Sequence, residues 1–173
     1  MFPLIIAVVV VAGLVGFIAS RPGSFRLERS IVIDTPPEKP FALVNDFHEW
    51  TKWSPFENVD ADLKRTYGGA PNGVGATYDW DGKKSGIGHM EILEAPAPQK
   101  VVIKLDFIKP FPAHNMAIFS FTPTGAGTTA TWTMTGPMAF MNKAMSTVMP
   151  MEKMMGPVFE QGLASMKAAA ESA

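Results

Sequence analysis

Few residues of this 173-residue chain have the types and spacing that catalysis or metal binding needs. The three histidines, His48, His89 and His114, form no i, i+4 pair, and the chain has no cysteine, so no metal site is expected. No serine stands in a Gly-x-Ser-x-Gly turn. The sequence therefore predicts no catalytic residue and no cofactor.

Two further patterns that suggest chemistry are incomplete. Asp79 and Asp81 alternate with Tyr78 and Trp80 and so face away from them, which argues against a carboxylate pair acting as acid and base in a pocket. Residues 82–85 and 86–91 resemble phosphate-binding loops but lack required glycine and hydroxyl positions. Both segments are expected to be turns or bulges, with the lysines of the first at a solvated hairpin tip.

The densest chemical feature is residues 46–56, where four aromatic side chains fall within eleven residues, just after a short helical pattern. Three interpretations are open: a platform for stacking bases or sugars, the mouth of an apolar pocket, or part of a core. A net charge of -1 argues against a nucleic-acid partner, which needs a basic surface. Base stacking is thereby removed, and the other two interpretations remain.

The N-terminal residues 2–19 form an uncharged, apolar run of about the minimum length that spans a bilayer as a helix. We expect a transmembrane anchor over residues 1–20 and a linker over 21–24; a cleaved signal peptide and a buried core helix are the alternatives. Arg21, Arg26 and Arg29 follow the run and no basic residue precedes it. The positive-inside rule then predicts a single-pass membrane protein with its folded domain in the cytoplasm.

The remaining residues alternate in patterns that predict an α+β domain. Residues 25–34 read as a strand and 38–46 as a short helix opened by proline. A series of strands separated by turn residues follows, over 61–67, 74–81, 84–94, 99–108, 114–123 and 127–136, and residues 140–171 are helical. Short links imply an antiparallel sheet, and only the terminal helix is long enough to cover its apolar face.

This order of elements, with residues 29–41, 50–56, 73–80, 86–90 and 155–163, resembles the polyketide cyclase/dehydrase and START-like superfamily. These are the SRPBCC proteins, whose helix-grip fold is shared with birch-pollen-allergen-type proteins. The resemblance covers nearly all of residues 25–173. It implies a curved antiparallel sheet wrapped around a long C-terminal helix, with a ligand cavity between them. The superfamily includes enzymes, lipid carriers, hormone sensors and regulators, so the resemblance does not fix the chemistry.

Large side chains on the inward side of the strands and on the last helix are the candidate ligand-binding residues. They are Tyr78, Trp80, Met90, Phe107, Phe119, Trp132, Met134, Met151, Met155 and Phe159, with Trp53, Phe56 and Phe111 at the pocket rim. The alternative is that they form a packed core. Eight of the twelve methionines lie between Met138 and Met166, which suits either a wall of loose specificity or a soft core. Pro150 either bends the last helix or begins it.

The function we expect is binding of a small hydrophobic ligand, such as a lipid, isoprenoid or polyketide-like molecule, next to the membrane that residues 2–19 would enter. The first alternative is a cyclase or dehydratase in which Tyr78, His114 or Asn115 orients the substrate. The second is a protein-interaction regulator with a filled core and an exposed apolar patch. The sequence leaves ligand identity and oligomeric state open.

Overall fold

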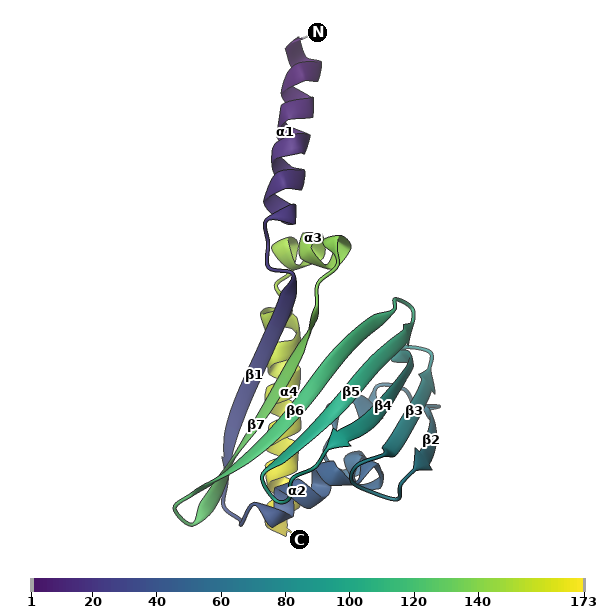
Figure 1. Cartoon of the computed structure of the whole chain (residues 1–173), viewed down its shortest axis with the longest axis vertical. Coiled ribbons are helices and arrows are strands. Elements are labelled where there is room, and N and C mark those ends of the chain that lie inside the picture. Colours follow the sequence, from purple (N-terminus) through teal and green to yellow (C-terminus); the bar gives the residue numbers. More distant parts are fainter. Residues whose placement is uncertain (1, 173) are drawn as a thin grey trace.

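The computed structural model describes residues 2–172 as a curved sheet with helices at one face and one end (Figure 1). In chain order the elements are α1 (Phe2–Ala19), β1 (Ser24–Ile33), α2 (Glu38–Asn45), the 3-10 helices η1 (Phe47–Lys52) and η2 (Pro55–Asn58), β2 (Lys64–Gly69), β3 (Ala76–Gly82), β4 (Gly86–Glu94), β5 (Lys100–Lys109), β6 (Ala113–Thr124), β7 (Gly127–Pro137), α3 (Phe140–Val148) and α4 (Met151–Ser172).

The strands form one seven-stranded antiparallel sheet in the order β1-β7-β6-β5-β4-β3-β2. Consecutive strands from β2 to β7 are neighbours, as short turns require, and β1 closes the far side by pairing with β7. Apolar and polar residues alternate along the strands, so one face of the sheet is buried. In β5, for example, Ile103 and Leu105 are buried, whereas Lys104 between them is exposed. The predicted strand series and its antiparallel pairing are confirmed.

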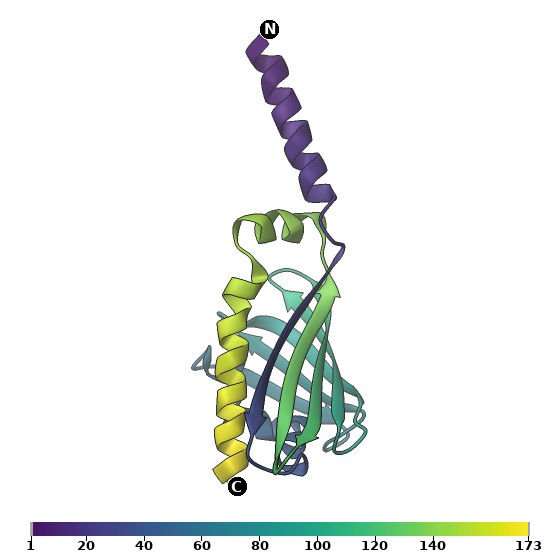
Figure 2. The ribbon, with the colours of Figure 1, turned by 90° about the vertical axis from the view of Figure 1, so that its left-hand side faces the viewer.

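The long helix α4 lies along one face of the sheet, as Figure 2 shows from the side. Its buried residues recur at helical spacing and include Phe159, Leu163 and Met166. Two sets of ion pairs join it to β1 and to the residue after β1. Arg29 contacts Glu160 and Glu152 through nitrogen–oxygen distances of 2.8 and 3.1 Å, and Lys167 contacts Asp34 at 3.0 Å. This α+β arrangement confirms the predicted helix-grip architecture.

The C-terminal tail is two helices rather than one. Helix α3 ends at Val148 and α4 begins at Met151, so Pro150 stands directly before the second helix, where its missing N–H costs least. In both views α3 lies across the end of the sheet that is nearer to α1 (Figures 1 and 2). Of the two roles left open for Pro150, the structure shows that of a helix start.

The structure does not support the predicted transmembrane anchor over residues 1–20. Residues 2–19 do form a helix, α1, but over the described part of the chain no helix combines the length and apolar character needed to cross a membrane. The single-pass, cytoplasmic topology stays an untested prediction.

Candidate functional site

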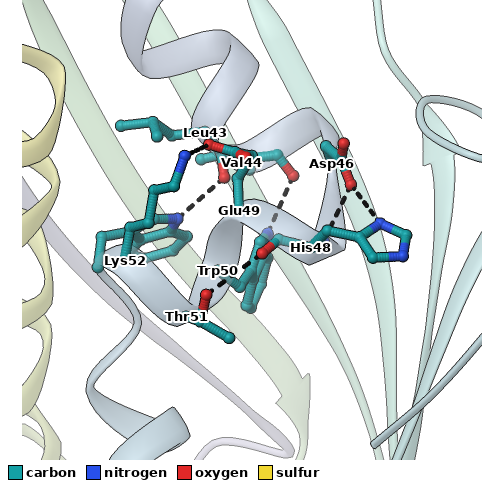
Figure 3. Close-up of polar contacts among 9 residues, drawn as sticks. Leu43, Val44, Asp46, His48, Glu49, Trp50, Thr51 and Lys52 are labelled. Atoms are coloured by element: carbon teal, nitrogen blue, oxygen red, sulfur yellow. Dashed lines mark hydrogen bonds and ion pairs between the residues drawn. The ribbon is translucent and has the colours of Figure 1, made fainter. Parts of the chain in front are cut away.

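The aromatic stretch of residues 46–56 is folded into η1 and η2 and is fixed to the end of α2 (Figure 3). The indole N–H of Trp50 donates to the carbonyl oxygen of Val44 at 3.1 Å, and that of Trp53 donates to the carbonyl oxygen of Leu43 at 2.9 Å. The last carbonyls of a helix have no partner within it, so these bonds complete the C-terminal end of α2. The two tryptophans thereby point inward, beneath the short helices.

Trp53 belongs to a group of contacting rings that we call the aromatic cluster: Trp53, Phe119, Trp132 and Phe159. The rings of Trp132 and Phe159 are nearly parallel, with centroids 3.9 Å apart. Phe119 also stacks on Trp132, with ring centroids 5.0 Å apart. Gly162 makes this approach possible, because a Cβ there would lie 2.9 Å from the Trp132 ring and from Pro55. At the aromatic cluster, sheet and helix are closely packed.

Beside the aromatic cluster the same sheet and helix separate to leave a cavity of about 520 Å³. This is within the range of small-molecule sites in proteins. Its wall draws on β1, η1, η2, β3 to β7, the connecting loops and the first turns of α3 and α4. The lining residues are Phe25, Trp50, Ser54, Phe56, Glu57, Val59, Leu63, Tyr78, Trp80, Lys84, Ser85, Met90, Leu105, Phe107, Ala113, Asn115, Ala117, Trp132, Met134, Pro137, Met138, Asn142, Met151 and Met155.

The structure divides the residues that the sequence predicts as ligand contacts. Eight of the ten lie on the cavity wall: Tyr78, Trp80, Met90, Phe107, Trp132, Met134, Met151 and Met155. Phe119 and Phe159 instead fill the aromatic cluster and are buried. Contact with a ligand stays a prediction for all of them.

The three residues expected at the rim have three different positions. Phe56 lies on the cavity wall, where its ring meets that of Trp132 edge-on. Trp53 belongs to the aromatic cluster instead of the rim, because its N–H is bound to α2. Phe111 is in the turn between β5 and β6, is 80% exposed and does not line the cavity.

A buried carboxylate marks one side of the cavity, and sequence reasoning missed it. Glu57 of η2 is only 5% exposed. Its Oε1 accepts a hydrogen bond from the Tyr78 hydroxyl at 2.8 Å, and its Oε2 accepts one from Arg65 Nε at 2.6 Å. Arg65 also donates to the Glu57 backbone oxygen at 2.9 Å. The network satisfies a charge that would otherwise be costly to bury.

The electrostatics of this network hold Tyr78 in its neutral form. Burial raises the pKa of the Tyr78 phenol, and the hydrogen bond to Glu57 raises that pKa further, because both disfavour the phenolate. The same ion pair raises the pKa of Arg65. Tyr78 therefore faces the cavity as a phenol whose proton is already donated to Glu57.

Other polar atoms of the wall have no partner. The Ser54 hydroxyl and the Trp132 indole nitrogen are buried without a hydrogen bond among the described residues. Asn115 of β6 also lines the cavity, and it is 9% exposed. By contrast His114 is directed to the outer face, where its Nδ1 lies 2.7 Å from Asp106 Oδ1. Of the three residues proposed to orient a substrate, Tyr78 and Asn115 reach the cavity and His114 does not.

The rim of the cavity includes a hairpin turn that is fastened by one carboxylate. Asp60, in the loop after η2, accepts hydrogen bonds from the Ser85 hydroxyl at 2.6 Å, the Ser85 N–H at 2.7 Å and the Lys84 N–H at 2.9 Å. The Ser85 bonds, followed by the Lys84 bond, lower the pKa of Asp60. Both Lys84 and Ser85 line the cavity, so this contact fixes part of its mouth.

Across residues 2–172 the structure brings together no group of three or more histidine, aspartate or glutamate side chains suited to an ion. His48 and His89 each contact a neighbouring aspartate, Asp46 and Asp79, at 2.8 and 2.7 Å. The cavity is an apolar volume with a few neutral hydrogen-bonding groups, one carboxylate paired with Arg65, and Lys84 at its mouth.

A smaller pocket of about 190 Å³ lies apart from this site, by β2 and the start of β3. It is lined by Phe47, His48, Tyr67 and a glycine-containing turn. We take the larger cavity as the candidate site, because it has both the volume for a ligand and the buried polar groups.

Comparison with known proteins gives a family and a fold. The family model described as polyketide cyclase / dehydrase and lipid transport matches residues 24–171. No sequence among proteins of curated function matches the chain.

Solved structures share the fold at low sequence identity. A Thermobifida fusca protein is similar with a TM-score of 0.63 and 22% identity over 85% of this chain and 93% of its own. The Aha1 dimer from Colwellia psychrerythraea has a TM-score of 0.60 and 15% identity, over 85% of this chain and 96% of its own. The di-domain ARO/CYC StfQ from the steffimycin biosynthetic pathway has a TM-score of 0.59 and 13% identity, over 86% of this chain and 52% of its own.

Proposed function

Because the chain belongs to the polyketide cyclase / dehydrase and lipid transport family, we propose that it binds a small hydrophobic molecule in the cavity between the sheet and α4. The observation that carries the proposal is the cavity itself, about 520 Å³ enclosed mainly by methionine, aromatic and aliphatic side chains. Such a wall contributes about 25 cal/mol for each Å² of apolar ligand surface that leaves water.

The nature of the wall supports loose selectivity for the apolar body of the ligand. Met90, Met134, Met151 and Met155 contribute flexible, polarizable side chains from both the sheet and the helix. Such side chains adapt to ligands of different outline. We therefore expect several apolar ligands of similar size to bind with similar affinity.

A cyclase-type reaction has less support from the same wall. A phenol whose proton is donated to Glu57 and whose pKa is raised is a poor general base near neutral pH. His114, the other titratable candidate, lies on the outer face. A regulator without a ligand predicts a filled interior, which the cavity argues against.

The test is a comparison of two phenylalanine variants of the full chain at neighbouring positions of β6. Ala117→Phe places a ring in the cavity, whereas Met116→Phe places one on the outer side of the sheet. We would titrate each protein with the fluorescent probe N-phenyl-1-naphthylamine and identify by mass spectrometry any molecule that copurifies under native conditions.

The proposal expects wild type and Met116→Phe to bind the probe with the same affinity, and Ala117→Phe to lose at least tenfold, which is about 1.4 kcal/mol. Equal binding by all three proteins, or no binding by wild type, contradicts it.

A further inference from the structure

Two side-chain amides line the cavity, Asn142 of α3 and Asn115 of β6, and Asn115 is the one set in the sheet. Across four strands the paired residues are Tyr78, Met90, Leu105 and Asn115. Strands in a sheet are about 4.8 Å apart, so Asn115 is about 14 Å across the sheet from Tyr78. The charges of Glu57 and Arg65, which are beside Tyr78, are therefore remote from this amide.

The side chain of Asn115 is buried without a protein partner. It is 9% exposed, and no described residue makes a hydrogen bond to its amide. Its polar atoms are not among the unpaired atoms that are sealed from solvent, so the amide opens into the cavity instead of the packed core. A leucine would fill the same space with apolar atoms alone, so the amide is the polar exception among the apolar residues of this row.

Gly136 of β7 provides the space for this amide. A Cβ at Gly136 would lie 2.0 Å from Asn115 Oδ1 and 2.8 Å from the ring of Phe25. Any side chain at Gly136 would therefore displace the amide. With Oδ1 lying against β7, the amide N–H groups are the donors left for a bound molecule.

We infer that Asn115 is a polar recognition point of the cavity and that it donates a hydrogen bond to a neutral carbonyl oxygen of an otherwise apolar ligand. The inference rests on the proposed function, since it names the ligand class of the same cavity. An apolar ketone or ester would occupy the methionine-rich volume and satisfy the amide at the same time.

The charges around the cavity favour a neutral group over a carboxylate. The guanidinium of Arg65 is already bound to Glu57 and to the Leu63 carbonyl oxygen. Lys84 lines the cavity from the hairpin turn and is exposed. A carboxylate at Asn115 would thus be buried without a cation, at a cost that a ketone oxygen avoids.

The experiment uses two probes of nearly identical shape, fluorene and 9-fluorenone, which differ by one carbonyl oxygen. Their affinities for the full chain are measured by displacement of N-phenyl-1-naphthylamine. The variants are Asn115→Leu, which removes the amide, and His114→Leu, which makes the same change at the adjacent residue on the outer face. 9-Fluorenone-4-carboxylate tests the preference for a neutral ligand.

The measured quantity is the ratio of fluorenone affinity to fluorene affinity, in which the apolar contribution cancels. We expect Asn115→Leu to lower this ratio roughly tenfold, about 1.4 kcal/mol, and His114→Leu to leave it unchanged. The carboxylate is expected to bind wild type more weakly than fluorenone does. A ratio that Asn115→Leu leaves unchanged, or a carboxylate that binds more tightly than the ketone, overturns the inference.

Failure of the inference differs from failure of the proposed function. If wild type binds neither fluorene nor the displacement probe, the cavity is not a ligand site and both fail. If fluorene binds wild type and the ratio does not respond at Asn115, only the inference fails.

Thermal unfolding separates recognition from a structural role. Without ligand, Asn115→Leu is expected to raise the unfolding midpoint by about 2–4 °C, because it removes an unpaired buried amide. A lowered midpoint would show that the amide stabilises the fold, against the inference. Asn115→Ala provides a second measurement of the affinity ratio, and the same roughly tenfold loss is expected.

Discussion

The aromatic cluster and the cavity are made by the same two layers, yet one is filled and the other is not. In the aromatic cluster, Trp132 of the sheet stacks directly on Phe159 of α4. One turn earlier on the same helix, Met155 faces the cavity. On the sheet side the cavity wall includes Ala113, Asn115 and Ala117, which are too small to reach the helix. Side-chain size, not backbone architecture, decides which part is hollow.

The two regions also differ in what stabilises them. The aromatic cluster relies on buried apolar area and ring contacts. Around the cavity, polar contacts hold the wall in place, through Glu57 with Tyr78 and Arg65, and through Asp60 with Ser85. A protein that keeps a cavity must support its wall by contacts made outside that cavity.

The largest effect is expected from truncation of the aromatic cluster. Phe159→Ala should lower the free energy of unfolding by about 3–5 kcal/mol, because it removes a stacked, fully buried ring. Met155→Ala, four residues earlier, should cost less than about 2 kcal/mol, below the range for a fully buried methionine, because Met155 is only partly buried and borders the cavity. Urea denaturation measures both. Equal losses would contradict the division into a filled and a hollow region.

A smaller loss is expected from the polar support of the cavity wall. Glu57→Gln removes the charge that accepts from Arg65 and should cost about 2 kcal/mol, in the range of hydrogen bonds to charged groups. The matched control is Glu94→Gln, which breaks the exposed pair with Lys100 and should cost less than about 1 kcal/mol. If the two variants unfold at the same urea concentration, the Glu57 network does not support the wall.

The smallest effect concerns the rim and depends on pH. Hydrogen bonds from Ser85 and Lys84 lower the pKa of Asp60 in the folded chain below its unfolded value. Its contribution to stability is therefore present above about pH 4 and is lost as the pH falls through the folded pKa. Asp60→Asn should make stability less dependent on pH as the pH falls below about 4.

Urea titrations across that pH range provide the measurement. Asp62→Asn, at an exposed position two residues away, is the control and should follow the wild-type curve. Curves for wild type and Asp60→Asn that run parallel through the acidic range would show that the Asp60 contacts add no stability at the rim.

The sequence predicts the fold better than it predicts which inward-facing residues line the cavity. Alternation along the strands and turn residues between them are local signals, so the sheet and its inward faces could be predicted. Which inward residues meet a partner is not local. Phe159 and Met155 lie on the same face of α4. Phe159 is in the core because Trp132 stacks on it, whereas Met155 faces the open volume of the cavity.

The missed residues have a similar explanation. Glu57 follows directly on the aromatic stretch, and a glutamate in a short segment without periodicity reads as exposed. The 3-10 turn η2 directs it inward, where Arg65 and Tyr78 from β2 and β3 meet it. Trp53 and Phe56 are both aromatic and only three residues apart, so the sequence does not distinguish them. The hydrogen bond from Trp53 to Leu43 of α2 holds Trp53 in the core, whereas Phe56 lines the cavity.

The central claim is that the volume beside the aromatic cluster is a site for an apolar ligand, and a crystal structure of the full chain with 2-bromofluorene tests it most directly. Anomalous scattering locates the bromine without reference to side-chain density. We predict a bromine peak inside the cavity, among Met90, Met134 and Met155, with the aromatic cluster unchanged. A ligand bound only at the outer surface, or a cavity that stays empty at saturating ligand, would contradict the claim.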